Sequence, residues 1–394
     1  TNLYPNLSVS VMNSRRPANT PFKQQRLNAW QPILTPTWVI GTFLIIGLIF
    51  IPIGLSLLSQ SDAVVEYTKQ YDGDGTDSAL ASCQITTTNS GYDTNTTCTV
   101  TFTVSSKMPK PVYVYYELSN FYQNHRKYVK SLSFKQLRGE TVPSSDLSDC
   151  APLDSVTKTD GGKYTLNPCG LVANSLFNDV INVTSRQEMS EYGIAWDSDV
   201  NEKFDNPADF KSSSCVCSSS ASGGCQSAAF CGSPGAGDGG YECGEKHEEH
   251  KDPSTGVCYA YQYPDESGTQ YLYESYPMVV QPQEGVKNEH FIVWMRTAGL
   301  PKFRKLYGII DEDLEVGDEV TFEVQPNFNV VGFSGTKSIV LSTVSWFGGK
   351  NPFLGQSYIV VGAICVGAAV VFGVKHMVRP RKLGDTRYLV WKEA

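Results

Sequence analysis

The chain has 394 residues, eleven cysteines and a formal net charge of −8. This length allows one to three domains. The two ends, residues 1–37 and 375–394, each carry a net charge of +4, so the stretch between them carries −16. So acidic a central part excludes a nucleic-acid-binding protein, which needs basic surface to meet the phosphate backbone.

Two long runs without charge, residues 38–58 and 353–374, predict transmembrane helices. As helices they would each span about 31–33 Å, enough for a hydrocarbon core of about 30 Å. A buried core helix or a cleaved signal peptide is the alternative. The first run is too long for the apolar part of a signal peptide, and it begins well inside the chain.

Basic residues flank both runs on their terminal sides, in KQQR before the first and in KHMVRPRK after the second. Because positive loops stay in the cytosol, both termini are expected there. We therefore expect a membrane protein of the endoplasmic reticulum, Golgi, endosomes or plasma membrane. The predicted order is a cytosolic tail (1–37), a span (38–58), a lumenal or extracellular ectodomain (59–352), a second span (353–374) and a cytosolic tail (375–394).

The cysteines agree with this topology, because ten of the eleven lie between the two runs. The eleventh, Cys365, lies inside the second run, where it acts as a small apolar residue. Cysteines in an oxidising compartment are expected to form disulfides. Two glycosylation sequons, at Asn95 and Asn182, fall in the same region.

Alternating apolar and polar residues predict strands, so the ectodomain is expected to be mainly β, as an antiparallel sandwich with long loops. The predicted strands are residues 97–104, 111–118, 290–295, 319–324 and 338–346. Helical patterns are weak and limited to residues 122–132 and 301–309.

Residues 211–258 differ from the rest in being rich in Ser, Gly and Cys, which predicts a surface insertion. Its six cysteines are Cys215, Cys217, Cys225, Cys231, Cys243 and Cys258. They could form disulfides, or Cys215 and Cys217 could bind zinc together with His247 and His250. Disulfides are the preferred interpretation for an oxidising compartment, so we expect no metal and no cofactor.

Motifs for catalysis are weak. YDGDGTD (71–77) matches the D-x-D-x-T pattern of aspartate-nucleophile phosphohydrolases, but it lacks their preceding apolar strand, and a solvated acidic turn is the preferred interpretation. HEEH (247–250) lacks the spacing of zinc peptidases. No nucleophile elbow and no phosphate-binding loop is present. These observations point away from an enzyme.

Two further patterns leave alternatives open. NHRKYVKS (124–131) is basic within an acidic ectodomain, and it could contact phosphate or form a solvated helix face that pairs with local acids. In the second run, Ala363 and Gly367 form a small-xxx-small pair, which could dock a partner helix or pack the two spans together. Pro52 and Gly54 are expected to bend or loosen the first helix.

Seven stretches together resemble the cell-division-control-protein-50 family, the β subunits of type IV P-type ATPases that flip phospholipids. They are RRPANTPFKQQRLNAWQP (15–32), LIFIPIG (48–54), YYELSNFYQNHRKYVKS (115–131), PCGLVANSLFND (168–179), GIAWDSD (193–199), HFIVWMRTAGLPKFRKLYG (290–308) and NPFLGQSYIVVG (351–362). The resemblance covers nearly the whole chain apart from the insertion and the extreme termini.

The resemblance implies a non-catalytic partner that binds the ATPase, supports its exit from the endoplasmic reticulum and is needed for its activity on membrane phospholipids. It also implies disulfides Cys83–Cys98 and Cys150–Cys169, and glycosylation at Asn182 and, less directly, at Asn95. A free-standing receptor or adhesion module, with the insertion as its binding region, is a second hypothesis. A lumenal metal-dependent hydrolase is a third.

In this family the segment before the first span lies along the cytosolic membrane surface and contacts the ATPase. The resemblance therefore implies that Trp30 lies at the headgroup level. It also implies that four prolines keep the segment extended: Pro17, Pro21, Pro32 and Pro36. Lys23 and its basic neighbours would face anionic lipid or acidic loops of the ATPase. The residues expected to bind the partner are Arg15, Arg16, Pro17, Phe22, Arg26 and Trp30.

Overall fold

The structure is a computed structural model, and it divides the chain into two units. Residues 1–58 and 353–394 form the first unit, and residues 59–352 form the second, the ectodomain. The structure describes residues 17–27, 35–86, 97–159, 161–216, 257–265 and 267–380, without the side chains of 211–216 and 257–262.

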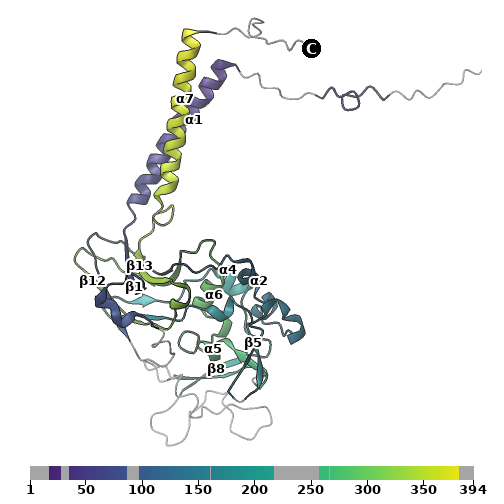
Figure 1. The fold of residues 1–394 in the computed structure, drawn as a ribbon, viewed down its shortest axis with the longest axis vertical. Helices are drawn as coiled ribbons and strands as arrows, with labels where there is room; N and C mark the ends of the chain where they lie inside the picture. The colour runs from purple at the N-terminus through teal and green to yellow at the C-terminus, as the bar shows by residue number, and fades with distance from the viewer. Residues whose placement is uncertain are drawn as a thin grey trace, which may run out of the picture. The chain divides into compact units, whose positions relative to one another are not determined.

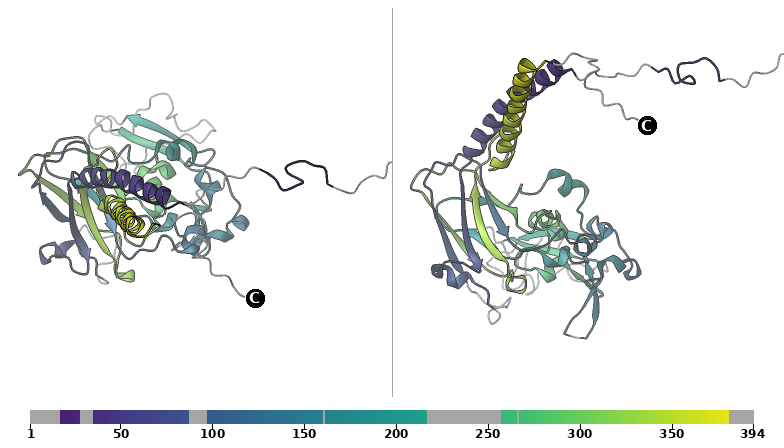
Figure 2. Two further views of the ribbon diagram at one scale, coloured as in Figure 1. Left: turned by 90° about the horizontal axis from the view of Figure 1, so that it is seen from above. Right: turned by 45° about the horizontal axis from the view of Figure 1, so that its top comes forward.

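Two long helices, α1 (Pro36–Asp62) and α7 (Pro352–Val378), dominate the first unit and lie side by side in Figures 1 and 2. Both are long and apolar enough to cross a membrane. Each extends a few residues beyond the uncharged run that predicts it. α1 continues through Pro52 without a break in its helical assignment.

The main sheet of the ectodomain has five antiparallel strands in the order β1-β13-β3-β11-β7. Their bounds are β1 Glu66–Gly73, β3 Val112–Leu118, β7 Met189–Ser190, β11 Phe303–Ile310 and β13 Thr336–Ser342. The second sheet, in the order β2-β12-β6, is also antiparallel. It contains β2 Cys98–Thr103, β6 Val180–Val183 and β12 Glu319–Gln325.

One hydrophobic core lies between these two sheets and takes side chains from both. Phe102 of β2 and Phe322 of β12 meet edge to face at 5.9 Å, and Tyr116 of β3 stacks on Phe177 at 3.9 Å. On β2 the buried residues alternate with exposed or half-buried ones, as a strand with one face on a core requires. The predicted antiparallel, mainly-β ectodomain is therefore confirmed, and Figure 2 shows its strands in two further views.

Smaller elements surround the sandwich. A three-stranded sheet is formed by β4 Ser155–Thr157, β5 Lys163–Asn167 and β10 Thr269–Tyr271, and a two-stranded ribbon by β8 Lys211–Val216 and β9 Val257–Gln262. Short helices complete the unit: α2 Arg126–Lys130, α3 Phe134–Leu137, α4 Asp197–Glu202, α5 Leu272–Ser275 and α6 Glu289–Met295.

Four of the five predicted strands are confirmed, as β2, β3, β12 and β13. The strand predicted at residues 290–295 is wrong, because this apolar run forms α6. Asn288 caps the helix by accepting a hydrogen bond from the Phe291 amide at 3.1 Å. Lys305 closes its other end by donating to the carbonyl oxygen of Trp294 at 2.9 Å. A short apolar run does not distinguish a buried helix from a buried strand.

The helix predicted at residues 301–309 is also wrong, because this segment forms β11 and pairs with β3 on one side and β7 on the other. Phe303, Lys305 and Tyr307 alternate on its buried face. The helix predicted at residues 122–132 is shorter than expected and consists of α2 alone.

Candidate functional site

The contact between α1 and α7 is made where both helices carry glycine. A Cβ added to Gly54 would lie 2.8 Å from the carbonyl oxygen of Gly355, and one added to Gly355 would lie 2.9 Å from that of Gly54. A Cβ on Gly47 would lie 2.9 Å from the carbonyl oxygen of Gly362. Only glycine allows the two backbones to come this close.

These glycines repeat every seven residues on both helices, which keeps one face of each helix turned toward its neighbour. Gly355, Gly362 and the buried Ala369 follow this spacing along α7. The rings of Phe50 and Tyr358 add an aromatic contact at 5.0 Å. This repeat was missed in the prediction, although the spacing of the glycines in the sequence is sufficient to locate it.

Ala363 and Gly367, the pair singled out in the sequence, do not make this contact. Both are exposed on α7, and a Cβ on Gly367 would meet no atom within 4 Å in the part of the chain that the structure describes. They lie among exposed large apolar residues, including Val360 and Val371. Because exposed apolar surface of this extent needs a cover of lipid or protein, the outward face of α7 is a candidate docking surface.

The described part of the N-terminal segment, residues 17–27, is exposed almost throughout. It is not extended as expected, because residues 20–26 form a turn in which the Arg26 amide donates to the carbonyl oxygen of Pro21 at 2.7 Å. Phe22 is 76% exposed at this turn, and the Arg26 guanidinium donates to the Asn19 side chain at 3.4 Å. An exposed phenylalanine beside a basic residue suits contact with a partner or a lipid headgroup region.

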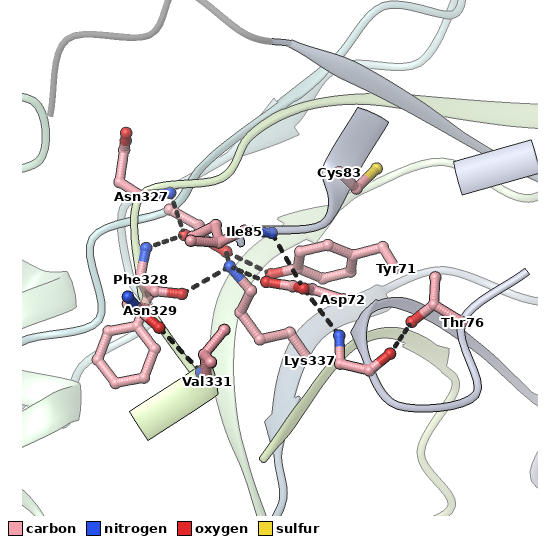
Figure 3. A network of polar contacts seen from close by, with 12 residues as sticks. Tyr71, Asp72, Thr76, Cys83, Ile85, Asn327, Phe328, Asn329, Val331 and Lys337 are labelled. Atoms are coloured by element: carbon pink, nitrogen blue, oxygen red, sulfur yellow. Dashed lines mark hydrogen bonds and ion pairs between the residues drawn. The ribbon is translucent and has the colours of Figure 1, made fainter. Parts of the chain in front are cut away.

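In the ectodomain, Lys337 is buried between two carboxylates (Figure 3). Its ammonium lies 2.7 Å from Asp179 and 3.1 Å from Asp72, and it donates to the carbonyl oxygen of Phe328 at 2.8 Å. Tyr71 donates to the same Asp179 oxygen at 2.7 Å. Burial raises the pKa of Asp72, although the nearby Lys337 ammonium opposes this shift. The pKa of Tyr71 is also raised, mainly by burial and to a smaller extent by the negative charge of Asp179.

A β-bulge explains why the predicted solvated turn is wrong for Asp72. The register of β1 against β13 shifts between Gln70 and Asp72, so that Asp72 pairs with Lys337. Tyr71 and Asp72 are consecutive and both buried, because a bulge re-aims the side chains of its strand. Asp74 and Asp77, by contrast, are exposed as expected for an acidic turn.

This cluster serves structure rather than catalysis. Asp72 accepts a hydrogen bond from the Gly73 amide at 2.8 Å in addition to its ion pair, so it is held on several sides. The Thr76 hydroxyl donates to the carbonyl oxygen of Gly73 at 2.8 Å. Within the described part of the chain, no three His, Cys, Asp or Glu side chains are grouped so that they could hold a metal ion.

The basic stretch at residues 124–131 does not pair with local acids. Arg126, Lys127 and Lys130 of α2 are exposed, and none of them forms an ion pair with another described residue. Phe134 of α3, the next helix along the chain, is 70% exposed. Unpaired cations with an exposed aromatic ring form a second surface suited to an acidic partner.

Two disulfides stabilise the ectodomain. Cys83–Cys98 links a turn of 3₁₀-helix (Ser78–Cys83) to the start of β2. Cys150–Cys169 lies in a small core of its own with Leu147 and Leu166. These are the two pairs that the family resemblance implies.

The structure places the remaining predicted site residues as follows. Asn182 is exposed on β6, an edge strand, where a glycan can be attached. Cys215 and Cys258 are described by their backbones only, on β8 and β9. The others lie outside the described residues: Arg15, Arg16, Trp30, Asn95, Cys217, Cys225, Cys231, Cys243, His247 and His250.

Comparison with known proteins agrees with this architecture. The profile of the LEM3 (ligand-effect modulator 3) family / CDC50 family matches residues 57–382. The chain belongs to the CDC50 family. A relative in Arabidopsis thaliana, "ALA-interacting subunit 3", is 39% identical over 98% of this chain and 93% of its own length.

Two further members of the CDC50 family are similar along most of their length. "Cell cycle control protein 50A" of Mus musculus is 37% identical over 91% of this chain and 88% of its own length. "Phospholipid-transporting ATPase accessory subunit CRF1" of Saccharomyces cerevisiae is 31% identical over 96% of this chain and 90% of its own length.

Proposed function

We propose that the chain is the non-catalytic β subunit of a type IV P-type ATPase that moves phospholipid across the bilayer. The observation that carries the proposal is the near-complete overlap with relatives whose names describe accessory or interacting subunits, one of them of a phospholipid-transporting ATPase. In such a heterodimer the phosphoryl-transfer chemistry and the lipid path belong to the other chain. This chain then contributes binding surfaces and supports the exit of the complex from the endoplasmic reticulum.

The outward face of α7 is the docking surface that we assign to the membrane. The glycine contact already joins α1 to α7, so it does not use Ala363 and Gly367. Helices in lipid associate through close packing of small residues rather than through the hydrophobic effect. A span of the ATPase packs against this face of α7, and lipid covers the rest of the helix pair.

The tails are cytosolic in this proposal, and the ectodomain faces the lumen or the cell exterior. The basic flanks support this orientation. Arg15, Arg16 and Arg26 contact anionic headgroups and acidic loops of the ATPase, while Phe22 and Trp30 enter the headgroup region. Glycans at Asn182 and Asn95 would be added on the opposite side of the membrane.

Purification of the tagged full chain in mild detergent, followed by mass spectrometry, tests the proposal. We expect a near-stoichiometric P-type ATPase, with ATP hydrolysis that phospholipid stimulates in the same sample. A monodisperse chain without an ATPase would contradict the proposal and would favour a free-standing receptor or adhesion module.

The role of the N-terminal tail is tested separately with the double variant Arg15→Gln/Arg16→Gln. It is expected to reduce the co-purified ATPase several-fold and to leave the ectodomain folded. Arg381→Gln/Lys382→Gln, which removes the same charge from the other tail, is the matched control. Equal recovery of the ATPase with both variants would contradict a specific role for Arg15 and Arg16.

A further inference from the structure

The ribbon of β8 and β9 forms the base of the cysteine-rich insertion. Its antiparallel register runs from Lys211 opposite Gln262 to Val216 opposite Val257. Within it, Cys215 lies directly opposite Cys258. These two cysteines, 43 positions apart in the sequence, are thus adjacent in the fold.

Directly opposite residues of an antiparallel pair are within disulfide reach. Their Cα atoms lie about 4.5 or about 5.5 Å apart, depending on the hydrogen-bonding position, and they share one face of the ribbon. Disulfides span Cα distances of about 4.4–6.8 Å. The register also favours Cys215 over the nearby Cys217 as the partner of Cys258. Cys217 would lie opposite Cys258 only if β8 were shifted by two residues against β9.

The root of the ribbon is anchored to the rest of the ectodomain. At the root, the rings of Phe210 and Tyr263 lie 4.7 Å apart, and the Tyr263 hydroxyl donates to the carbonyl oxygen of Pro282 at 2.6 Å. Away from the root, the last described pair is Val216 opposite Val257. An isolated two-stranded ribbon is only marginally stable in water, and no third strand is paired with this one in the described structure. Cys215 and Cys258 are the pair next to Val216 and Val257, far from the anchored root, where a covalent link would stabilise the two strands.

We propose that Cys215 and Cys258 form a third disulfide, which closes the insertion at its base. The two thiols lose their protons, and the sulfur–sulfur bond forms as two electrons pass to a disulfide oxidant such as a thiol–disulfide oxidoreductase or oxidised glutathione. That oxidant takes up the two electrons and two protons and is released as two thiols. The remaining cysteines of the insertion are an even set of four: Cys217, Cys225, Cys231 and Cys243.

This pairing also separates the two interpretations of the insertion. A sulfur in a disulfide has no thiolate to offer a metal, so a zinc site that uses Cys215 and this disulfide exclude each other. The pairing goes beyond the proposed function, because it requires only an oxidising compartment and not the ATPase.

The direct test maps the disulfides of the full chain. The protein is isolated from membranes with its free thiols alkylated, digested without reduction, and fragmented by a method that cleaves between Cys215 and Cys217. We expect a linked peptide pair whose fragments assign the bond to Cys215 and Cys258. A bond from Cys258 to any other cysteine, an alkylated Cys258, or stoichiometric zinc with reduced Cys215 would overturn the proposal.

Variants provide an independent test that does not depend on fragmentation. Cys215→Ser is expected to make Cys258 available for alkylation, and Cys258→Ser to do the same for Cys215. Cys217→Ser is the matched control, two residues away, and it should leave Cys258 protected. Alkylation of Cys258 in the Cys217→Ser variant, or its protection in the Cys215→Ser variant, contradicts the assignment.

The other two disulfides make the result interpretable. Intact Cys83–Cys98 and Cys150–Cys169 bonds in the same sample show that the ectodomain folded in an oxidising compartment. An unpaired Cys258 in that sample then counts against the third disulfide alone. Recovery of the ATPase is scored separately, so failure of the proposed function cannot be confused with failure of this pairing.

Discussion

In the α1–α7 pair the closest contacts are made by glycines and most large apolar side chains face outward, whereas in the ectodomain large side chains fill the core. Leu48 and Ile364 are 62% and 64% exposed on the helices, while Phe322 and Trp294 are fully buried in the ectodomain. The difference follows from the solvent. Apolar side chains gain by leaving water but gain nothing by leaving lipid, so the helices associate through close backbone packing instead.

The two units also differ in whether charged side chains are buried. The uncharged runs at 38–58 and 353–374 contain no Asp, Glu, Lys, Arg or His that would need a partner in lipid. The ectodomain buries Lys337 and surrounds it with Asp72 and Asp179. Its stability therefore depends on pairing a buried cation with two carboxylates, while that of the helix pair depends on backbone proximity.

The largest expected effect comes from Lys337→Met. It leaves Asp72 and Asp179 buried without their cation, which should cost about 3–5 kcal/mol of the free energy of unfolding. Chemical denaturation of the purified full chain, followed by tryptophan fluorescence, measures the change. Lys110→Met is the control, because it removes a lysine whose ion pair with Asp311 is long, at 3.7 Å, and exposed on both sides. Equal stability of the two variants would contradict a structural role for the buried cluster.

Removal of a disulfide should have the next largest effect on the ectodomain. The double variant Cys83→Ser/Cys98→Ser opens a short loop, which a chain-entropy estimate values at about 3 kcal/mol. Thermal unfolding with and without reductant measures the loss. When reductant is added, the unfolding midpoint of the variant should fall less than that of wild type, because the variant has one disulfide fewer to lose. An unchanged midpoint in the variant without reductant would argue against the bond.

In the helix pair, Gly54→Ala should separate α1 from α7, because the new Cβ meets the Gly355 carbonyl oxygen at 2.8 Å. Overpacking of this kind costs about 1–3 kcal/mol. Gly367→Ala is the matched control, since its Cβ would meet no atom of the described residues within 4 Å. Disulfide cross-linking of cysteines introduced on the facing sides of the two helices should decrease only for Gly54→Ala.

Gly367 then distinguishes packing within the pair from docking of a partner. A larger residue there, in Gly367→Leu, should leave cross-linking between α1 and α7 intact but lower the amount of co-purified ATPase. Loss of cross-linking in this variant would show that α7 uses the same face for both contacts.

The smallest effect is expected at Asp199, a buried carboxylate whose two cationic partners, Arg296 and Lys203, are themselves exposed. The Arg296 guanidinium, 2.5 Å from Asp199, lowers the pKa of that carboxyl, and Lys203 contributes at 2.6 Å. A carboxyl whose folded pKa is lowered stabilises the fold above its unfolded pKa of about 3.9, and this contribution is lost as the pH falls through the folded value. Arg296→Gln should therefore lower the unfolding midpoint at pH 7, and the difference from wild type should shrink below pH 4.

The local pattern of the sequence was sufficient for several elements. The strands β2 and β12 alternate apolar and polar residues because one face meets the core, so their period was visible in the chain. The two long helices were visible for the same kind of reason, since a span must be apolar over its whole length. Of the candidate site, the seven-residue glycine repeat was also present in the sequence, but the choice between these glycines and Ala363 and Gly367 as the contact needed the structure.

The sequence by itself thus determined the two apolar helices, the class of the ectodomain and the family. Only the tertiary structure decided that residues 289–295 form a helix, because burial on several sides removes the period that tells a helix from a strand. It alone decided that Asp72 is buried, because the bulge in β1 brings this residue opposite Lys337, 265 positions along the chain. The apolar period of a single strand or helix shows which of its faces meets the core. The partner of a buried charge depends instead on the register between strands that are distant in the sequence.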